Sequence, residues 1–62
     1  MEPPVPLDDQ IAELEDERAR RIRAASWQRA RKSFSERWYG IGLRRLDAAI
    51  ATLKALRDEP LA

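Results

Sequence analysis

The clearest pattern of apolar positions lies in the second half of the chain. Apolar residues recur there at steps of three and four, at Leu43, Leu46, Ile50 and Leu53, with Ala49 and Leu56 widening the stripe. This spacing is typical of an amphipathic helix. Gly40 and Gly42 precede the stripe and permit a tight entry, and Pro60 follows it and cannot continue a helix. We therefore predict a helix over residues 43–57 and a short tail over residues 58–62.

A weaker apolar stripe lies in the first half. Its members are Ile11, Leu14, Ile22 and Ala25, with the aliphatic stem of Arg18 filling the missing step. Asp8 or Asp9 can cap the first free amides of a helix, which predicts a helix over residues 8–25. Residues 1–7 hold three prolines, which fix the backbone torsion φ and lack an N–H donor. We expect these residues to form an extended arm.

Neither helix can bury its stripe alone, and a chain of 62 residues makes one domain at most. The simplest solution lays the two helices antiparallel and face to face, within a single domain over residues 8–57. The predicted helix–helix core then contains Ile11, Leu14 and Ile22 from the first helix and Leu43, Leu46, Ile50 and Leu53 from the second.

Residues 26–41 allow two interpretations. In a helical one, apolar residues recur at steps of three and four, at Trp27, Ala30, Phe34, Trp38 and Ile41. This segment then extends the first helix or adds another. In the other interpretation, residues 26–32 and 36–40 are short strands of a β-hairpin, joined by a polar turn. The periodicity favours the helix, although aromatic residues are also typical of strands.

The composition excludes several function classes. The chain has no cysteine and no histidine, which excludes disulfides, thiolate or imidazole metal sites, and catalysis that needs either residue. We predict no enzyme activity, no cofactor and no metal site. A domain this small buries little apolar surface, so docking or oligomerisation is expected. No apolar run is long enough to span a membrane, and the acidic, proline-rich start lacks the features of a secretory signal.

Charge is split along a chain whose net charge is only +1. Residues 1–17 carry acids and no base, whereas residues 18–45 are basic, with Glu36 as the single acid. Aromatic residues are interleaved with these bases, and together they form the predicted interface: Trp27, Arg29, Arg31, Lys32, Phe34, Arg37, Trp38 and Tyr39. Three interpretations fit this set: a protein-binding hot spot, a contact for single-stranded nucleic acid, or a small aromatic core with solvated arginines.

The order of these parts resembles the gpW-like family of small head-tail joining proteins of tailed bacteriophages. Residues 11–14 match its first helix, residues 29–39 take the place of its β-hairpin, and residues 43–56 match its second helix. The resemblance implies an α+β fold, two antiparallel helices with a short β-hairpin between them. We predict this fold, with an all-α helical hairpin as the alternative.

The same resemblance implies a structural subunit of the virion neck. Such subunits form a ring of copies beneath the portal protein, contact tail and neck proteins, and help to retain packaged DNA, which they touch without reading its sequence. We expect such a protein in the host cytoplasm before assembly. The residues themselves leave two alternatives: a small nucleic-acid-binding module, and a small helical adaptor or regulator that docks on another protein.

Overall fold

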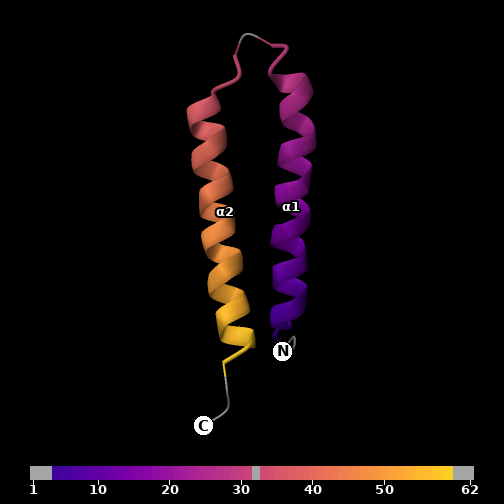
Figure 1. Cartoon of the computed structure of the whole chain (residues 1–62). Helices are drawn as coiled ribbons and strands as arrows, with labels where there is room; N and C mark the ends of the chain where they lie inside the picture. The colour runs from indigo at the N-terminus through magenta and orange to yellow at the C-terminus, as the bar shows by residue number, and fades with distance from the viewer. Residues whose placement is uncertain (1–3, 32, 60–62) are drawn as a thin grey trace.

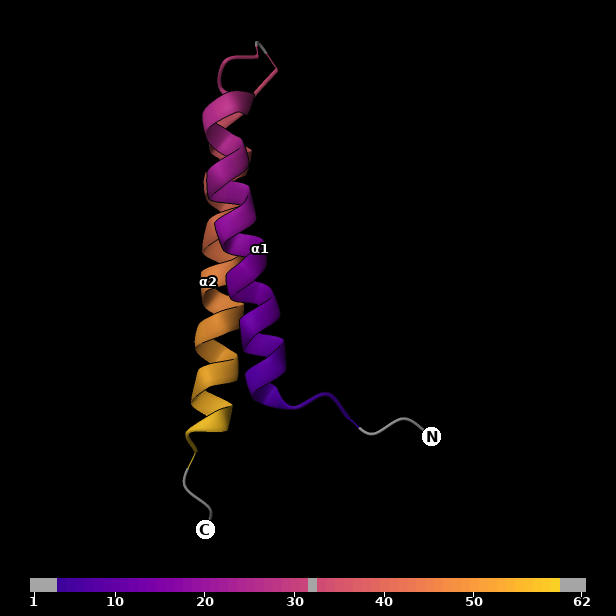
Figure 2. The ribbon, with the colours of Figure 1, turned by 90° about the vertical axis from the view of Figure 1, so that its right-hand side faces the viewer.

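The computed structural model describes residues 4–31 and 33–59 and contains two helices. Helix α1 spans Leu7–Gln28 and helix α2 spans Glu36–Arg57, so each has 22 residues. The helices run antiparallel and side by side, and the connection between them lies at one end of the pair (Figure 1). In the view turned by 90°, one helix lies over the other, which shows that the pair is a single layer (Figure 2).

The predicted α+β fold is wrong, and the all-α helical hairpin that stood as its alternative is confirmed. Residues 4–31 and 33–59 contain no β-strand. Within the segment predicted as a β-hairpin, residues 26–28 continue α1, residues 36–41 begin α2, and the described residues between them form a non-helical connection. The helical interpretation holds for Trp27, Trp38 and Ile41, which are helical, whereas Ala30 and Phe34 lie in the non-helical connection.

Helix α1 begins without the predicted side-chain cap. It starts at Leu7, one residue earlier than predicted, and Pro6 before it offers no side-chain hydrogen bond. Asp8 and Asp9, predicted as caps, lie in the first turn instead, where their charge complements the helix dipole. The predicted arm is non-helical over residues 4–6, and its first residues lie outside the described part of the chain.

Helix α2 begins at Glu36, well before the predicted start at residue 43. The cap is Ser35, whose side-chain oxygen accepts a hydrogen bond from the backbone N–H of Trp38 at 3.3 Å. Serine at this position satisfies one of the amides that have no partner within the helix. The helical residues before position 43 therefore add about two turns to α2.

The two glycines lie inside α2 and do not open it. Both Gly40 and Gly42 are helical, and no described residue has a positive φ. The prediction that they permit a tight entry is therefore wrong, because no turn exists at this point. The predicted end of the helix at residue 57 is confirmed. Pro60, predicted to stop it, lies outside the described residues.

The core is thin and lies between the facing sides of the helices. The buried apolar residues are Ile11, Ala25 and Ile50, and the half-buried ones include Leu14, Leu43, Leu46 and Leu53. Ile22 was predicted as a core residue but is 42% exposed. It lies two helical turns from Glu15, on the flank of α1, where part of its side chain is in solvent.

Ion pairs close one edge of the hairpin. They join Arg18 to Asp47 at 2.6 Å, Lys54 to Glu15 at 3.4 Å, and Arg57 to Asp8 at 3.1 Å. The antiparallel arrangement brings the acidic start of α1 beside the basic end of α2, so part of the split charge is neutralised within the chain. Within the described residues, neither helix is long and apolar enough to cross a membrane.

Candidate functional site

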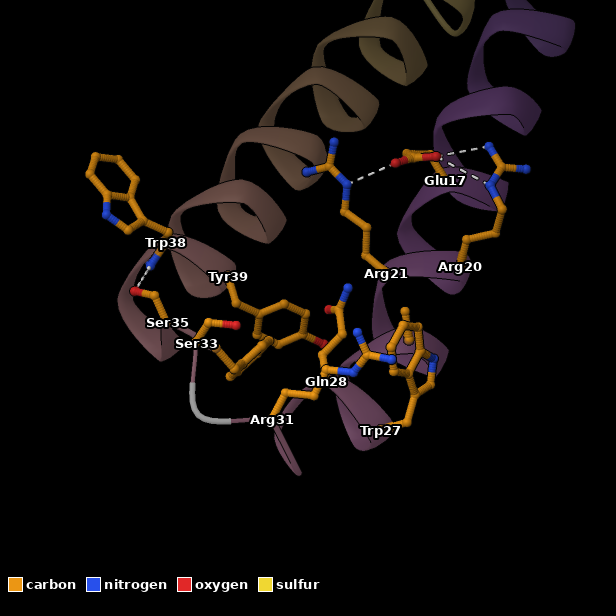
Figure 3. A pocket seen from close by; sticks show the side chains of 12 residues that line it. Glu17, Arg20, Arg21, Trp27, Gln28, Arg31, Ser33, Ser35, Trp38 and Tyr39 are labelled. Carbon is orange, nitrogen blue, oxygen red and sulfur yellow. Dashed lines mark hydrogen bonds and ion pairs between the residues drawn. The ribbon is translucent and has the colours of Figure 1, made fainter.

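A concavity of about 650 Å³ lies at the end of the hairpin where the helices are connected (Figure 3). Helix α1 lines one side, the connection forms the end, and the first turn of α2 lines the other side. Its lining combines aromatic, basic and small polar residues: Glu17, Arg20, Arg21, Ala24, Trp27, Gln28, Arg31, Ser33, Phe34, Ser35, Trp38 and Tyr39. Five of the predicted interface residues are among them, and Lys32 lies outside the described residues.

Three of the predicted interface residues hold the connection together. The rings of Phe34 and Tyr39 are half-buried, with centroids 5.4 Å apart and planes tilted by 52°. The guanidinium carbon of Arg29 lies 5.4 Å from the centroid of Phe34 and 5.3 Å from that of Tyr39. These cation–π distances are favourable. We call Phe34 and Tyr39 the aromatic core, and the exposed Arg29 lies against it.

Arg29 also joins the two helices through an ion pair. Its Nε donates to one carboxylate oxygen of Glu36 at 2.6 Å, and its Nη2 donates to the other at 3.2 Å. This bidentate hydrogen bond lowers the pKa of Glu36 and raises the pKa of Arg29. Because Glu36 is the first residue of α2, its negative charge also complements the helix dipole there.

The two tryptophans make a different arrangement. Trp27 is 54% exposed and Trp38 is 64% exposed, and Trp38 points away from α1 (Figure 3). An arginine lies against each ring: Arg31 at 4.8 Å from the ring of Trp27, and Arg37 at 5.9 Å from that of Trp38. We call these four residues the loop-end surface. Their exposure separates them from the aromatic core beside them.

An ion-pair cluster lies on the α1 side of the concavity, and the acid-before-base spacing of four residues from Glu17 to Arg21 predicts one of its pairs, which is confirmed. Glu17 accepts hydrogen bonds from Arg21 and Arg20, each at 2.9 Å, and these bonds lower its pKa. Arg20 and Trp27 follow Glu17 on the same side of α1, at helical steps of three and seven residues.

The loop-end arginines differ from those of this cluster. Arg20, Arg21 and Arg29 all have carboxylate partners, whereas Arg31 and Arg37 have none among the described residues. The guanidinium groups of Arg31 and Arg37 are therefore available to a carboxylate or phosphate from outside the chain.

The geometry gives no basis for acid–base catalysis here. Glu17 is held ionised by two arginines, so it is a poor proton donor near neutral pH. The described residues contain no group of three or more acidic side chains able to hold a metal ion. The site can bind, through apolar ring faces and guanidinium forks.

No family model, curated protein or solved structure matches the chain. The loop-end surface is therefore the feature of the chain that bears most directly on function.

Proposed function

We propose that this protein is a small, non-enzymatic helical adaptor that docks on another protein through the loop-end surface. The observation that carries this proposal is the pair of exposed tryptophans, each with an arginine against its ring, at one end of the hairpin. Tryptophan and arginine are the residue types most enriched at the energetic centres of protein interfaces. Covering two large indole rings also removes apolar area from water, at about 25 cal/mol per Å².

The same chemistry describes the partner. Arg31 and Arg37 present guanidinium groups whose fork geometry fits a carboxylate in a bidentate hydrogen bond. The tryptophan rings need apolar side chains to cover them. The partner surface is therefore apolar at its centre and carries aspartate or glutamate at its rim.

Single-stranded nucleic acid is the second candidate, since bases stack on aromatic rings and phosphates bind arginine. The geometry supports it less well. Each tryptophan already has an arginine against its ring, and Arg20 and Arg21 already pair with Glu17 on the concavity wall. A protein partner is compatible both with the arginines against the tryptophan rings and with the ion pairs of Glu17.

The role in a virion neck stays a prediction. It rested on a resemblance to a family whose fold contains a β-hairpin, and the described residues contain no strand. The observed fold therefore gives that role no support, and a ring of copies beneath a portal is not part of the proposal.

Affinity capture from the source cells tests the proposal. The tagged chain is compared with a Trp27→Ala, Trp38→Ala double variant and with a matched control, Ile22→Ala, which removes an exposed apolar side chain elsewhere on α1. We expect one defined protein to be retained by the wild type and the control, and its yield to fall at least tenfold with the double variant. Nuclease treatment is expected to leave the captured protein bound.

Two results would contradict the proposal. In the first, the double variant retains the same protein as well as the wild type does. In the second, the chain retains nucleic acid whose binding weakens steeply with added salt, as phosphate contacts require. Circular dichroism of each variant shows whether the helices are intact.

A further inference from the structure

The concavity beside the loop-end surface is bounded at both ends along the hairpin. The connection bounds one end, and the ion-pair cluster of Glu17 bounds the other, where Arg21 extends from α1 toward α2 (Figure 3). Gly42 makes room for this arginine, because a Cβ atom at Gly42 would lie 2.9 Å from Nη1 of Arg21 and displace it. The concavity is therefore a recess of limited length.

The length of the recess follows from the residues of α1 that line it. Arg21, Ala24 and Gln28 recur at steps of three and four, on one side of the helix. Arg21 and Gln28 are seven residues apart, which corresponds to about 10 Å along the helix axis. An extended segment rises about 3.3 Å per residue, so about four residues cover this length. The recess therefore fits a short segment better than a long helix.

The lining of the recess is positively charged. It contains three arginines and one glutamate, a formal charge of +2. The arginines are Arg20, Arg21 and Arg31, and the glutamate is Glu17. Glu13 also contacts Arg20, at 3.5 Å, but its side chain is 74% exposed and lies outside the lining. Exposed ion pairs of this kind are weak, so the lining is complementary to an acidic segment that carries two carboxylates.

Polar side chains without partners lie between these charges. Gln28 and Tyr39 are half-buried and Ser33 is exposed, and all three line the recess. Their side chains make no hydrogen bond within the described residues. Tyr39 extends from α2 toward α1, and Gln28 extends from α1 into the space between the helices (Figure 3). The amide and the two hydroxyls can therefore bind the backbone of a segment that enters the recess.

We propose that the partner docks by inserting a short, extended acidic segment into this recess. The segment carries an apolar side chain between two acidic ones. The apolar side chain packs against Ala24, Trp27 and Phe34. One carboxylate binds Arg31, and the other binds Arg21 at the opposite end.

The lining charge of +2 favours two side-chain carboxylates of an internal segment over the single carboxylate of a chain end. This proposal rests on the proposed function, because it takes the loop-end surface to be a protein-binding surface. It adds the form of the partner, since a flat surface could cover Trp27 and Trp38 without entering the recess.

Selection from a phage-displayed peptide library tests the proposal, with the full chain as the immobilised target. The random peptides have about seven residues, which exceeds the length of the recess. We expect the selected peptides to share an apolar residue between two acidic ones. The best peptide is then synthesised with both ends blocked, and its binding is followed by fluorescence anisotropy. We expect this peptide to bind, and a version with amides in place of its carboxylates to bind at least tenfold more weakly.

Two pairs of variants of the chain locate the bound peptide. Arg31→Gln is expected to weaken binding about tenfold, whereas its control Arg23→Gln, exposed and outside the lining, leaves binding unchanged. Gly42→Ala displaces Arg21 and is expected to weaken binding about threefold, the size of one exposed charge contact. Gly40→Ala is its control, because a Cβ atom there makes an ordinary contact at 3.6 Å. Circular dichroism shows whether the helices are intact.

Four outcomes would overturn the proposal. The library yields no peptide that binds the chain, or the selected peptides bind equally well without their carboxylates. Arg31→Gln or Gly42→Ala binds the peptide as well as its control does. A single-stranded oligothymidine displaces the peptide and binds more tightly than it.

The two proposals fail under different results. If no short peptide binds but Trp27 and Trp38 still determine the capture of a protein, the partner uses a folded surface and only the acidic segment is ruled out. If no peptide binds and capture does not depend on the tryptophans, the proposed function fails as well.

Discussion

Arg29 holds the two helices in their relative position at the connected end. Its side chain leaves the end of α1, lies against the rings of Phe34 and Tyr39, and binds the carboxylate of Glu36 at the start of α2. One guanidinium group thus combines ring contacts with a bidentate ion pair. Because both partners are exposed to solvent, this ion pair depends on pH and on salt.

Replacing Glu36 by glutamine tests the pH dependence of this ion pair. The bond from Arg29 lowers the pKa of Glu36 in the folded chain, so the pair stabilises the fold above the unfolded-state pKa of about 4.3. That contribution is lost as the pH falls through the lowered pKa. We expect Glu36→Gln to unfold at a lower temperature than the wild type at pH 7, and the difference to shrink in acid.

Thermal unfolding followed by circular dichroism measures this difference. Glu59→Gln is the matched control, since Glu59 lies after α2 and has no ion-pair partner within the described residues. A gap between Glu36→Gln and the wild type that stays constant from neutral to acid pH would show that the pair does not stabilise the folded connection.

At the scale of the elements, the sequence predicted the bodies of the helices better than their ends. The stripe from Leu43 to Leu53 indicated α2 correctly because its apolar spacing is regular over several turns. Its true start was missed because Ser35 was not recognised as a cap and the glycines were taken as a turn. A glycine has the same appearance in a sequence whether it is helical or not, and here tertiary packing keeps both in α2.

The stripe of α1 predicted a helix but not which flank faces outward. Ile22 fits the apolar spacing, yet it is 42% exposed, whereas Ala25 is buried. Which side of α1 faces α2 depends on the packing of the two helices, and the residues of α1 alone do not determine it. The sequence could not separate the exposed tryptophans from the half-buried Phe34 and Tyr39 for the same reason, since both groups are aromatic.

Gly40→Ala tests the assignment of this glycine to the helix interior. A Cβ atom there would meet the Arg44 guanidinium at 3.6 Å, which is an ordinary contact. Alanine loses less backbone entropy than glycine on folding, so we expect the variant to gain about 0.5–1 kcal/mol in its free energy of unfolding. Chemical denaturation measures the gain. Destabilisation would show that this position needs a conformation only glycine adopts readily.

At the scale of the whole molecule, the hairpin has little buried core for its length. Only Ile11, Ala25 and Ile50 are buried among the described apolar residues. A two-helix layer can bury one side of each helix, so much of its stability depends on few side chains.

A matched pair of isoleucine substitutions measures how far the thin core supports the fold. Ile11 is 3% exposed, and Ile11→Ala is expected to lower the free energy of unfolding by about 2–4 kcal/mol. Ile22 is 42% exposed, and Ile22→Ala is expected to cost less than about 1 kcal/mol. Urea unfolding of both variants checks the difference. Equal losses would contradict the assignment of Ile22 to the flank.

The central claim is that the loop-end surface binds protein, and photo-crosslinking at position 31 tests it most directly. A photoreactive amino acid replaces Arg31 in the source cells, with the exposed Ala51 as the control position. Mass spectrometry then identifies what is attached to the chain. We expect adducts with another protein at position 31 and none above background at position 51. Nucleic-acid adducts at position 31, or equal labelling at both positions, would contradict the claim.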